Sequence, residues 1–423
     1  MWFTRRGPHG FWDHQIQRGT VVLAAPWGVA AVFPGVGSQY AGMATRLHKR
    51  YEIVRETFTE ASDVLEFDVA ELCTATDASA RARLNLQTES QLALLTLGVA
   101  MFRAREQETG PAVTHTAGHS LGEYSALCAA GALPFATALR LVRHRGRCVA
   151  DVAARLDGGM MWVTGLDTGT VEHLCRLWSE QGVHPVHLSI VDGPRRAAVS
   201  GHRADLHEAA GEFEARGAQV FPLRVTGPFH SPLMAPAANA LADVLAGVDV
   251  AVPRMPVISG VDARPHPGGR AGARLLADQL VSPVRWHAVQ LRLAAEGVCT
   301  SLEMGPGRVL TFLSARTPGH PRPWPVDRYD DFDTLARDLC LGADDAPAVL
   351  DACLRIAVST PTRRQDTDVA GHYRRLEETR RTRPPDAIPA GLGALDALLT
   401  AKGIDEPERR RQLAAATGGR TWQ

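Results

Sequence analysis

Short apolar runs and helical patterns alternate along residues 28–157. Residues 29–33 are apolar without interruption and end at Pro34-Gly35, which is typical of a strand buried on both faces of a sheet. A helical pattern covers about residues 90–107, and a short strand at 113–117 leads through a glycine-flanked turn into a helix at 123–130. This order of strands and helices predicts an α/β architecture.

The middle of the chain has a different rhythm. The pattern predicts strands at 159–165, 185–191, 195–200 and 219–225, with helices at 168–180 and 204–216. The resulting order is strand, helix, strand, strand, helix, strand, which is the ferredoxin-like order. Because α/β patterns flank this stretch on both sides, we interpret residues 158–225 as an inserted subdomain.

The α/β pattern resumes after the insert. A helix is expected from 232 to about 245, a strand near 256–259, two helices within 270–296 and a strand at 298–303. We therefore expect one α/β subdomain over 28–157 and 226–330, interrupted by the insert. An irregular extension, 1–27, precedes it, and a helical extension, 331–423, follows it.

Composition narrows the classes of partner. Lysine plus arginine number 46 and aspartate plus glutamate number 46, so the formal net charge is zero and no global field attracts nucleic acid or an anionic membrane. Lys49 and Lys402 are the only lysines, and we attribute the excess of arginine to genomic base composition. The seven scattered cysteines fit reduced thiols, with no zinc pattern, and no signal or membrane-spanning segment is evident. We expect a cytoplasmic protein.

The sharpest local motif is Gly118-His119-Ser120-Leu121-Gly122 between a predicted strand and a predicted helix. In a nucleophile elbow of this form, the serine lies on a strained turn with its hydroxyl exposed at a helix N-terminus. Backbone N–H groups there can receive developing negative charge. The alternative is a serine that only caps the helix.

A serine nucleophile needs a base, and His230 is the best-placed histidine. It stands at a strand-to-helix junction, where Ser231 and Pro232 suit the first positions of a helix. Its position, and not its residue type, makes His230 the candidate base, because the chain has 16 histidines and most of them must be ordinary surface or core residues.

Arg145 lies within an apolar stripe of the helix that follows Pro134. Its neighbours at helical spacing on that face are apolar: Ala138, Leu141, Val142, Val149 and Val152. A guanidinium facing a core cannot lose its proton and therefore requires an anion or several acceptors. An internal carboxylate and a substrate carboxylate are equally good candidates.

Four separated motifs resemble the malonyl-CoA:acyl carrier protein transacylases, including the acyltransferase domains of polyketide synthases. The motifs occupy residues 33–39, 118–126, 229–234 and 303–307, and the resemblance covers about residues 28–316. The family fold that it implies is a hydrolase-like α/β subdomain with a ferredoxin-like insert, which agrees with the pattern above.

The resemblance implies roles for individual residues. Ser120 would be the nucleophile and His230 its base, oriented by the backbone carbonyl of Gln279. The N–H groups of Val36 and Leu121 would form the oxyanion hole.

Four further residues would bind substrate. Arg145 would pair with the malonyl carboxylate, Gln91 and His119 would line the same pocket, and Phe229 would favour malonyl over bulkier methylmalonyl groups. Three positions depart from the family pattern: Val36 replaces a glutamine, Leu92 a proline and Asp192 an asparagine.

The implied activity is transfer of a malonyl group from malonyl-CoA, through an acyl-serine, to the phosphopantetheine thiol of a separate acyl carrier protein. We expect a monomer with no bound metal or cofactor, in polyketide or related biosynthesis. The alternatives are transfer of another acyl group between carrier proteins, hydrolysis of acyl thioesters, and a non-catalytic scaffold with the same fold.

Overall fold

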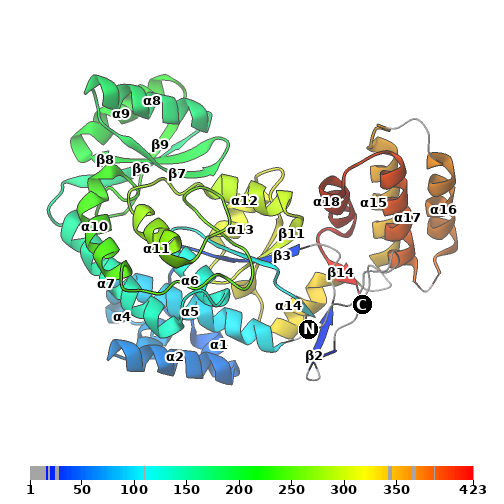
Figure 1. The fold of residues 1–423 in the computed structure, drawn as a ribbon, viewed down its shortest axis with the longest axis horizontal. Helices are drawn as coiled ribbons and strands as arrows, with labels where there is room; N and C mark the ends of the chain where they lie inside the picture. Colours follow the sequence, from blue (N-terminus) through cyan, green and yellow to red (C-terminus); the bar gives the residue numbers. More distant parts are fainter. Residues whose placement is uncertain are drawn as a thin grey trace.

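A five-stranded, fully parallel sheet forms the centre of the molecule (Figure 1). The computed structural model describes residues 16–17, 20–23, 28–108, 110–341, 345–363, 368–384 and 386–422. The strand order is β10 (Val257–Ile258), β5 (His115–Gly118), β3 (Gly28–Phe33), β11 (Val298–Glu303) and β12 (Arg322–Pro325). The predicted α/β architecture is confirmed.

Strand β3 is buried on both faces, which explains its unbroken apolar sequence. Val29, Ala31 and Phe33 pack with the first helical layer, and Ala30 and Val32 with the second. The first layer includes α2 (Glu52–Leu65), α5 (Gln87–Gln107), α6 (Gly122–Ala129) and α7 (Phe135–Ala153). The second contains α12 (Trp286–Ala295) and α13 (Val309–Ala315).

The insert forms a four-stranded antiparallel sheet in the order β7-β8-β6-β9. Its elements are β6 (Gly158–Thr164), α8 (Thr168–Gln181), β7 (His187–Gly193), β8 (Arg196–His202), α9 (Arg203–Ala215) and β9 (Gln219–Pro222). The ferredoxin-like order is therefore confirmed. Strand β9 ends before the predicted residue 225, because Leu223 makes a last backbone bond to Met160 and the chain then lines the cavity described below.

Several short elements differ from the sequence pattern. The helix predicted from residue 232 begins as a 3-10 turn, η1 (Pro232–Met234), before α10 (Ala235–Leu245), and α11 (Gly269–Asp278) follows later. Strand β12 was not predicted, because its two prolines are typical of a loop. Such prolines are tolerated in a strand only at the edge of a sheet, which is where β12 lies. Within the N-terminal extension expected to be irregular, β1 (Ile16–Gln17) and β2 (Thr20–Leu23) form a small sheet with β4 (Gly110–Pro111). The remaining N-terminal helices are α1 (Thr45–Arg50), α3 (Val69–Thr74) and α4 (Ala78–Leu84).

The C-terminal part is helical, as predicted. After η2 (Val326–Arg328), helix α14 (Phe332–Leu339) packs into the same core as α5. Helices α15 (Ala346–Ser359), α16 (Val369–Thr382), α17 (Ala387–Ala401) and α18 (Glu406–Thr417) form a separate cluster with its own hydrophobic core. Short strands β13 (Cys340–Leu341) and β14 (Thr421–Trp422) pair beside it.

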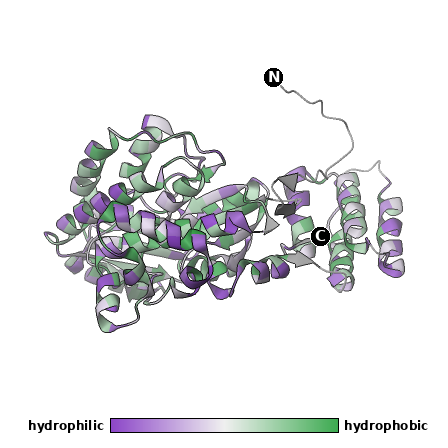
Figure 2. Ribbon diagram, turned by 90° about the horizontal axis from the view of Figure 1, so that it is seen from below, coloured by the Kyte–Doolittle hydropathy of each residue, from purple (hydrophilic) through white to green (hydrophobic). Residues whose placement is uncertain are grey.

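We call α15–α18 the C-terminal unit, which lies beside the N-terminal ends of the central strands (Figure 1). Its outermost helix, α16, is largely hydrophilic in Figure 2, in keeping with an apolar core formed mainly by α15 and α17. Thr300 of β11 donates its hydroxyl hydrogen to the carbonyl of Gly419, which fastens the unit to the sheet. Across the described ranges, no helix has the length and apolarity needed to span a membrane.

Candidate active site

Ser120 occupies the sharp turn between β5 and α6. Its φ of 51° is left-handed, which costs free energy for any residue other than glycine. The turn also requires glycine on both sides. A Cβ at Gly118 would lie 1.9 Å from the carbonyl carbon of Gly122, and a Cβ at Gly122 would lie 2.0 Å from the carbonyl oxygen of Phe33. No side chain caps α6. The Ser120 hydroxyl is therefore not a helix cap.

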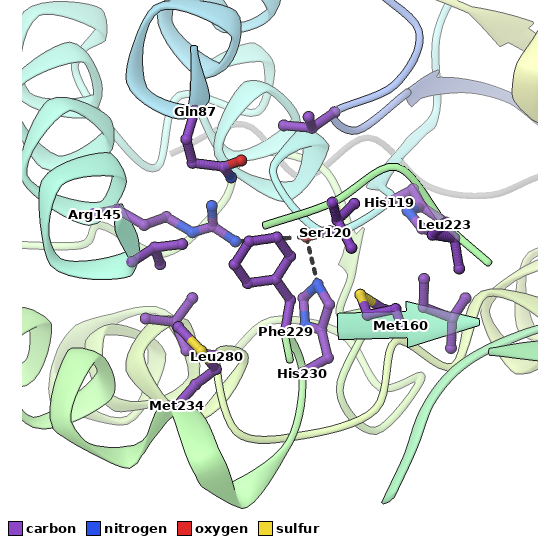
Figure 3. Close-up of a pocket in the computed structure, with 14 residues that line it drawn as sticks. Gln87, His119, Ser120, Arg145, Met160, Leu223, Phe229, His230, Met234 and Leu280 are labelled. Carbon is purple, nitrogen blue, oxygen red and sulfur yellow. Dashed lines mark hydrogen bonds between the residues drawn. The ribbon is translucent and has the colours of Figure 1, made fainter. Parts of the chain in front are cut away.

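His230 lies next to this hydroxyl. Its Nε2 is 2.8 Å from Ser120 Oγ (Figure 3). Its Nδ1 is 2.9 Å from the backbone oxygen of Gln279. Because a carbonyl can only accept, Nδ1 carries the hydrogen and Nε2 is left as the acceptor for the serine proton. Burial is the main cause that lowers the pKa of His230 to about 3, and the nearby guanidinium of Arg145 adds to it. The imidazole is thus neutral at neutral pH.

Arg145 reaches the same point from α7 and is 4% exposed. Its Nη1 donates to Gln91 Oε1 at 2.5 Å, whereas Nη2 makes only long contacts, 3.4 Å to Ser120 Oγ and 3.5 Å to Gln279 Oε1. Nε is buried and has no partner. Among the described residues, no carboxylate lies within ion-pair distance of this guanidinium. The guanidinium therefore keeps donors that no described residue satisfies at short distance.

The side chain of Gln279 connects these groups in a way that the sequence did not indicate. Its Nε2 donates to the carbonyl of Ser120 at 3.0 Å and to Glu123 Oε2 at 2.7 Å. Glu123 is buried, and burial raises its pKa to about 7. The only sequence signal for Glu123 was its place directly after the elbow motif. Gln279 was expected to contribute only its backbone carbonyl.

A cavity of about 100 Å³ opens beside Ser120 and His230. Its walls are mostly apolar and come from both subdomains; they include Val36, Val149, Met160, Ile190, Leu223, Phe229, Met234 and Leu280 (Figure 3). Gln91 is fully buried behind Arg145 and is not part of this wall. In the part of the chain that the structure describes, the backbone N–H groups of Val36 and Leu121 donate no hydrogen bond and remain available.

His119 links the elbow to the insert. Its Nε2 is 3.1 Å from Asp192 Oδ1, and its ring meets Trp286 edge-on at 5.7 Å between centroids. The other carboxylate oxygen of Asp192 lies 3.9 Å from Arg196 Nε. Asp192 does not line the cavity. Its carboxylate contacts these two side chains and does not face the cavity.

Comparison with known proteins agrees with this geometry. The family described as "Acyl transferase domain" matches residues 31–320. The chain belongs to this family. The malonyl CoA-acyl carrier protein transacylase of Escherichia coli strain K12 is 40% identical over 289 residues, which cover 68% of this chain and 92% of that relative.

Other members of the acyl transferase family come from polyketide pathways. The polyketide biosynthesis protein ThaF of Burkholderia thailandensis is 36% identical over 285 residues, covering 67% of this chain and 24% of ThaF. A further relative is a chain in the solved structure of PlMCAT:AntF, a type II polyketide synthase acyl carrier protein in complex with its malonyl-transacylase. That chain superposes with a TM-score of 0.69 at 35% identity, and the match covers 74% of this chain and 99% of that one.

Proposed function

We propose that this chain transfers a malonyl group from malonyl-CoA to the phosphopantetheine thiol of an acyl carrier protein, through an ester on Ser120. One observation carries the proposal: the Ser120–His230–Gln279 hydrogen-bonded series lies beside a buried guanidinium with no carboxylate partner among the described residues. The transacylase relatives named above support the same reaction.

In the first half-reaction, neutral His230 accepts the Ser120 proton at Nε2 while Oγ attacks the thioester carbonyl of malonyl-CoA. The oxyanion is stabilised by the N–H groups of Val36 and Leu121. The carbon–sulfur bond then breaks, and His230 returns its proton to the coenzyme A thiolate. The products are free coenzyme A and malonyl-Ser120.

In the second half-reaction, the phosphopantetheine thiol gives its proton to His230 and attacks the ester carbonyl. Collapse of the tetrahedral intermediate breaks the bond to Oγ, and His230 reprotonates the serine. Arg145 holds the free carboxylate in both halves with charge-assisted hydrogen bonds. Phe229, in the cavity wall, limits the space beside the acyl α-carbon.

The acceptor in this proposal is a separate acyl carrier protein. The carrier-protein complex of the type II polyketide synthase transacylase and the similarity to ThaF support a role in polyketide or related biosynthesis. We further propose that the chain acts as a monomer in the cytoplasm, where its six described free cysteines would remain reduced.

The mass of the intact protein after incubation with malonyl-CoA tests this function. We expect one malonyl adduct in the wild type and none in Ser120→Ala. When a phosphopantetheinylated carrier protein is added, we expect the enzyme to lose the adduct and the carrier protein to gain the mass of one malonyl group. Absence of the wild-type adduct would exclude malonyl transfer. Rapid release of free malonate without a carrier would instead indicate a thioester hydrolase.

A further inference from the structure

One polar side chain of the cavity wall, Gln87, is not used in the mechanism above. It is the first residue of α5, and its side chain makes no hydrogen bond with any other residue that the structure describes. Figure 3 shows its amide turned towards the guanidinium of Arg145. Gln87 is only partly buried, so its amide lies at the open cavity and is free to contact a bound ligand.

The packing of two helices fixes Gln87 beside Arg145. At Gly146, α7 approaches α5 so closely that a Cβ would lie 2.9 Å from Thr88 Oγ1 and 3.0 Å from its Cα. Gly146 directly follows Arg145, and Thr88 directly follows Gln87. The close approach therefore brings the start of α5, and with it Gln87, to the arginine.

Gln87 and Gln91 are four residues apart and share one face of α5. Gln91 accepts from Arg145 through Oε1, but its Nε2 is buried without a partner, as is Nε of Arg145. The guanidinium thus has an unpaired Nε of its own, with the unpaired Nε2 of Gln91 and the free amide of Gln87 nearby. All of these donors suit a carboxylate, and none suits a methyl group.

We propose that Gln87 donates its amide hydrogen to the free carboxylate of the acyl group and is a specificity-determining residue for malonyl over uncharged acyl groups. Arg145 supplies the charge, and Gln87 contacts the carboxylate from its place beside the guanidinium. An acetyl group offers no acceptor to the amide of Gln87 or to the guanidinium of Arg145, which penalises that substrate. This inference rests on the proposed malonyl transfer.

The test compares the rates of Ser120 acylation by malonyl-CoA and acetyl-CoA in the full-length chain. Gln87→Leu removes the amide at similar size, and we expect the malonyl-to-acetyl ratio of kcat/KM to fall about tenfold, the value of a hydrogen bond to a charged group. Gln87→Glu keeps the shape and adds repulsion, so its ratio should fall further. Gln107→Leu makes the same change at the exposed far end of α5 and serves as the matched control.

A wild-type ratio in both Gln87 variants, or an equal loss with both substrates, would overturn the assignment. Melting temperatures measured alongside separate a change in specificity from a loss of folding. If the wild type itself forms no malonyl adduct, the proposed function fails and Gln87 loses its assignment with it. If the wild type is malonylated and only the ratio is insensitive, the assignment of Gln87 alone fails.

Discussion

Arg145 in the active site and Lys402 in the C-terminal unit are both buried cations, and their hydrogen-bond partners differ. Nζ of Lys402 donates to the carbonyls of Ala357 and Thr360 at 2.7 and 2.5 Å, at the negative end of α15. Arg145 has one short hydrogen bond, two long ones and an unpaired Nε. A buried cation with satisfied donors stabilises the fold, whereas one with an incomplete set is available for a ligand.

The active site also contains backbone strain. Ser120 and His230 have φ values of 51° and 58°, whereas Lys402 has an ordinary helical φ of −73°. Such strain persists only where surrounding contacts enforce it, and it is typical of functional sites. The comparison therefore predicts that substitutions in the active site change activity and that substitutions around Lys402 in the C-terminal unit change stability.

The largest expected effect is on catalysis. His230→Ala removes the proton acceptor of Ser120, and we expect malonyl transfer to fall by roughly 10⁴-fold. Acylation kinetics followed by mass spectrometry measure this loss. The melting temperature measured alongside shows whether the variant remains folded, because alanine keeps the left-handed φ and leaves the space of a buried imidazole empty. A loss of less than tenfold would exclude His230 as the base.

Lys402→Met should instead lower stability. The carbonyls of Ala357 and Thr360 would lose their buried donor, at a cost of about 1–3 kcal/mol. Denaturant titration measures this change, and Arg145→Met is the matched control, in which we expect no comparable loss because its donors are incomplete. Equal destabilisation by both variants would remove the distinction between the two cations.

The pH dependence of stability tests Glu123. Burial raises its folded-state pKa from 4.5 to about 7, so the folded state holds this proton more tightly than the unfolded state. Its contribution to the free energy of unfolding is therefore greatest below pH 4.5 and is lost as the pH rises towards 7. Glu123→Gln should flatten the pH dependence in that window. If the dependence of the free energy of unfolding on pH were the same in Glu123→Gln as in the wild type, the raised pKa of Glu123 would be contradicted.

In the C-terminal unit, Glu408 has a pKa shifted in the opposite direction from that of Glu123. Hydrogen bonds from Arg411 and Gln412 lower the pKa of Glu408 in α18, so its contribution is lost as the pH falls. Glu408→Gln is the control for Glu123→Gln, since it should leave the slope between pH 4.5 and 7 unaltered.

The smallest expected effect concerns Asp192. Asparagine at this position still offers an oxygen to Nε2 of His119, so we expect Asp192→Asn to change kcat/KM for malonyl-CoA by about twofold or less. Steady-state kinetics check this, with Asp192→Leu as the contrasting variant that removes the acceptor. A tenfold effect of Asp192→Asn would show that the charge itself matters.

The sequence predicted those parts of the structure that local pattern controls. Strand β3, the elbow at Ser120 and the order of the insert follow from unbroken apolar runs, flanking glycines and alternating periods. Strand β12 escaped prediction because prolines at a sheet edge resemble a loop.

The site was predicted less completely than the fold. The apolar stripe of α7 identified Arg145. To decide whether a carboxylate of the chain itself pairs with Arg145, the positions of all nearby carboxylates were needed. Gln87 and the side chain of Gln279 gave no signal, because their roles depend on the approach of α5 to α7 and on the end of α11. Such contacts join segments far apart in sequence and have no local pattern.

The central claim is that the incomplete hydrogen bonding of Arg145 is the binding site of the acyl carboxylate. The most direct test is the ratio of Ser120 acylation rates with malonyl-CoA and acetyl-CoA in Arg145→Met, measured beside Lys402→Met. The account predicts a fall of about 100-fold in the ratio for Arg145→Met, since a charge-assisted pair is lost, and a wild-type ratio for Lys402→Met. An Arg145→Met enzyme that retains its preference for malonyl would contradict the claim.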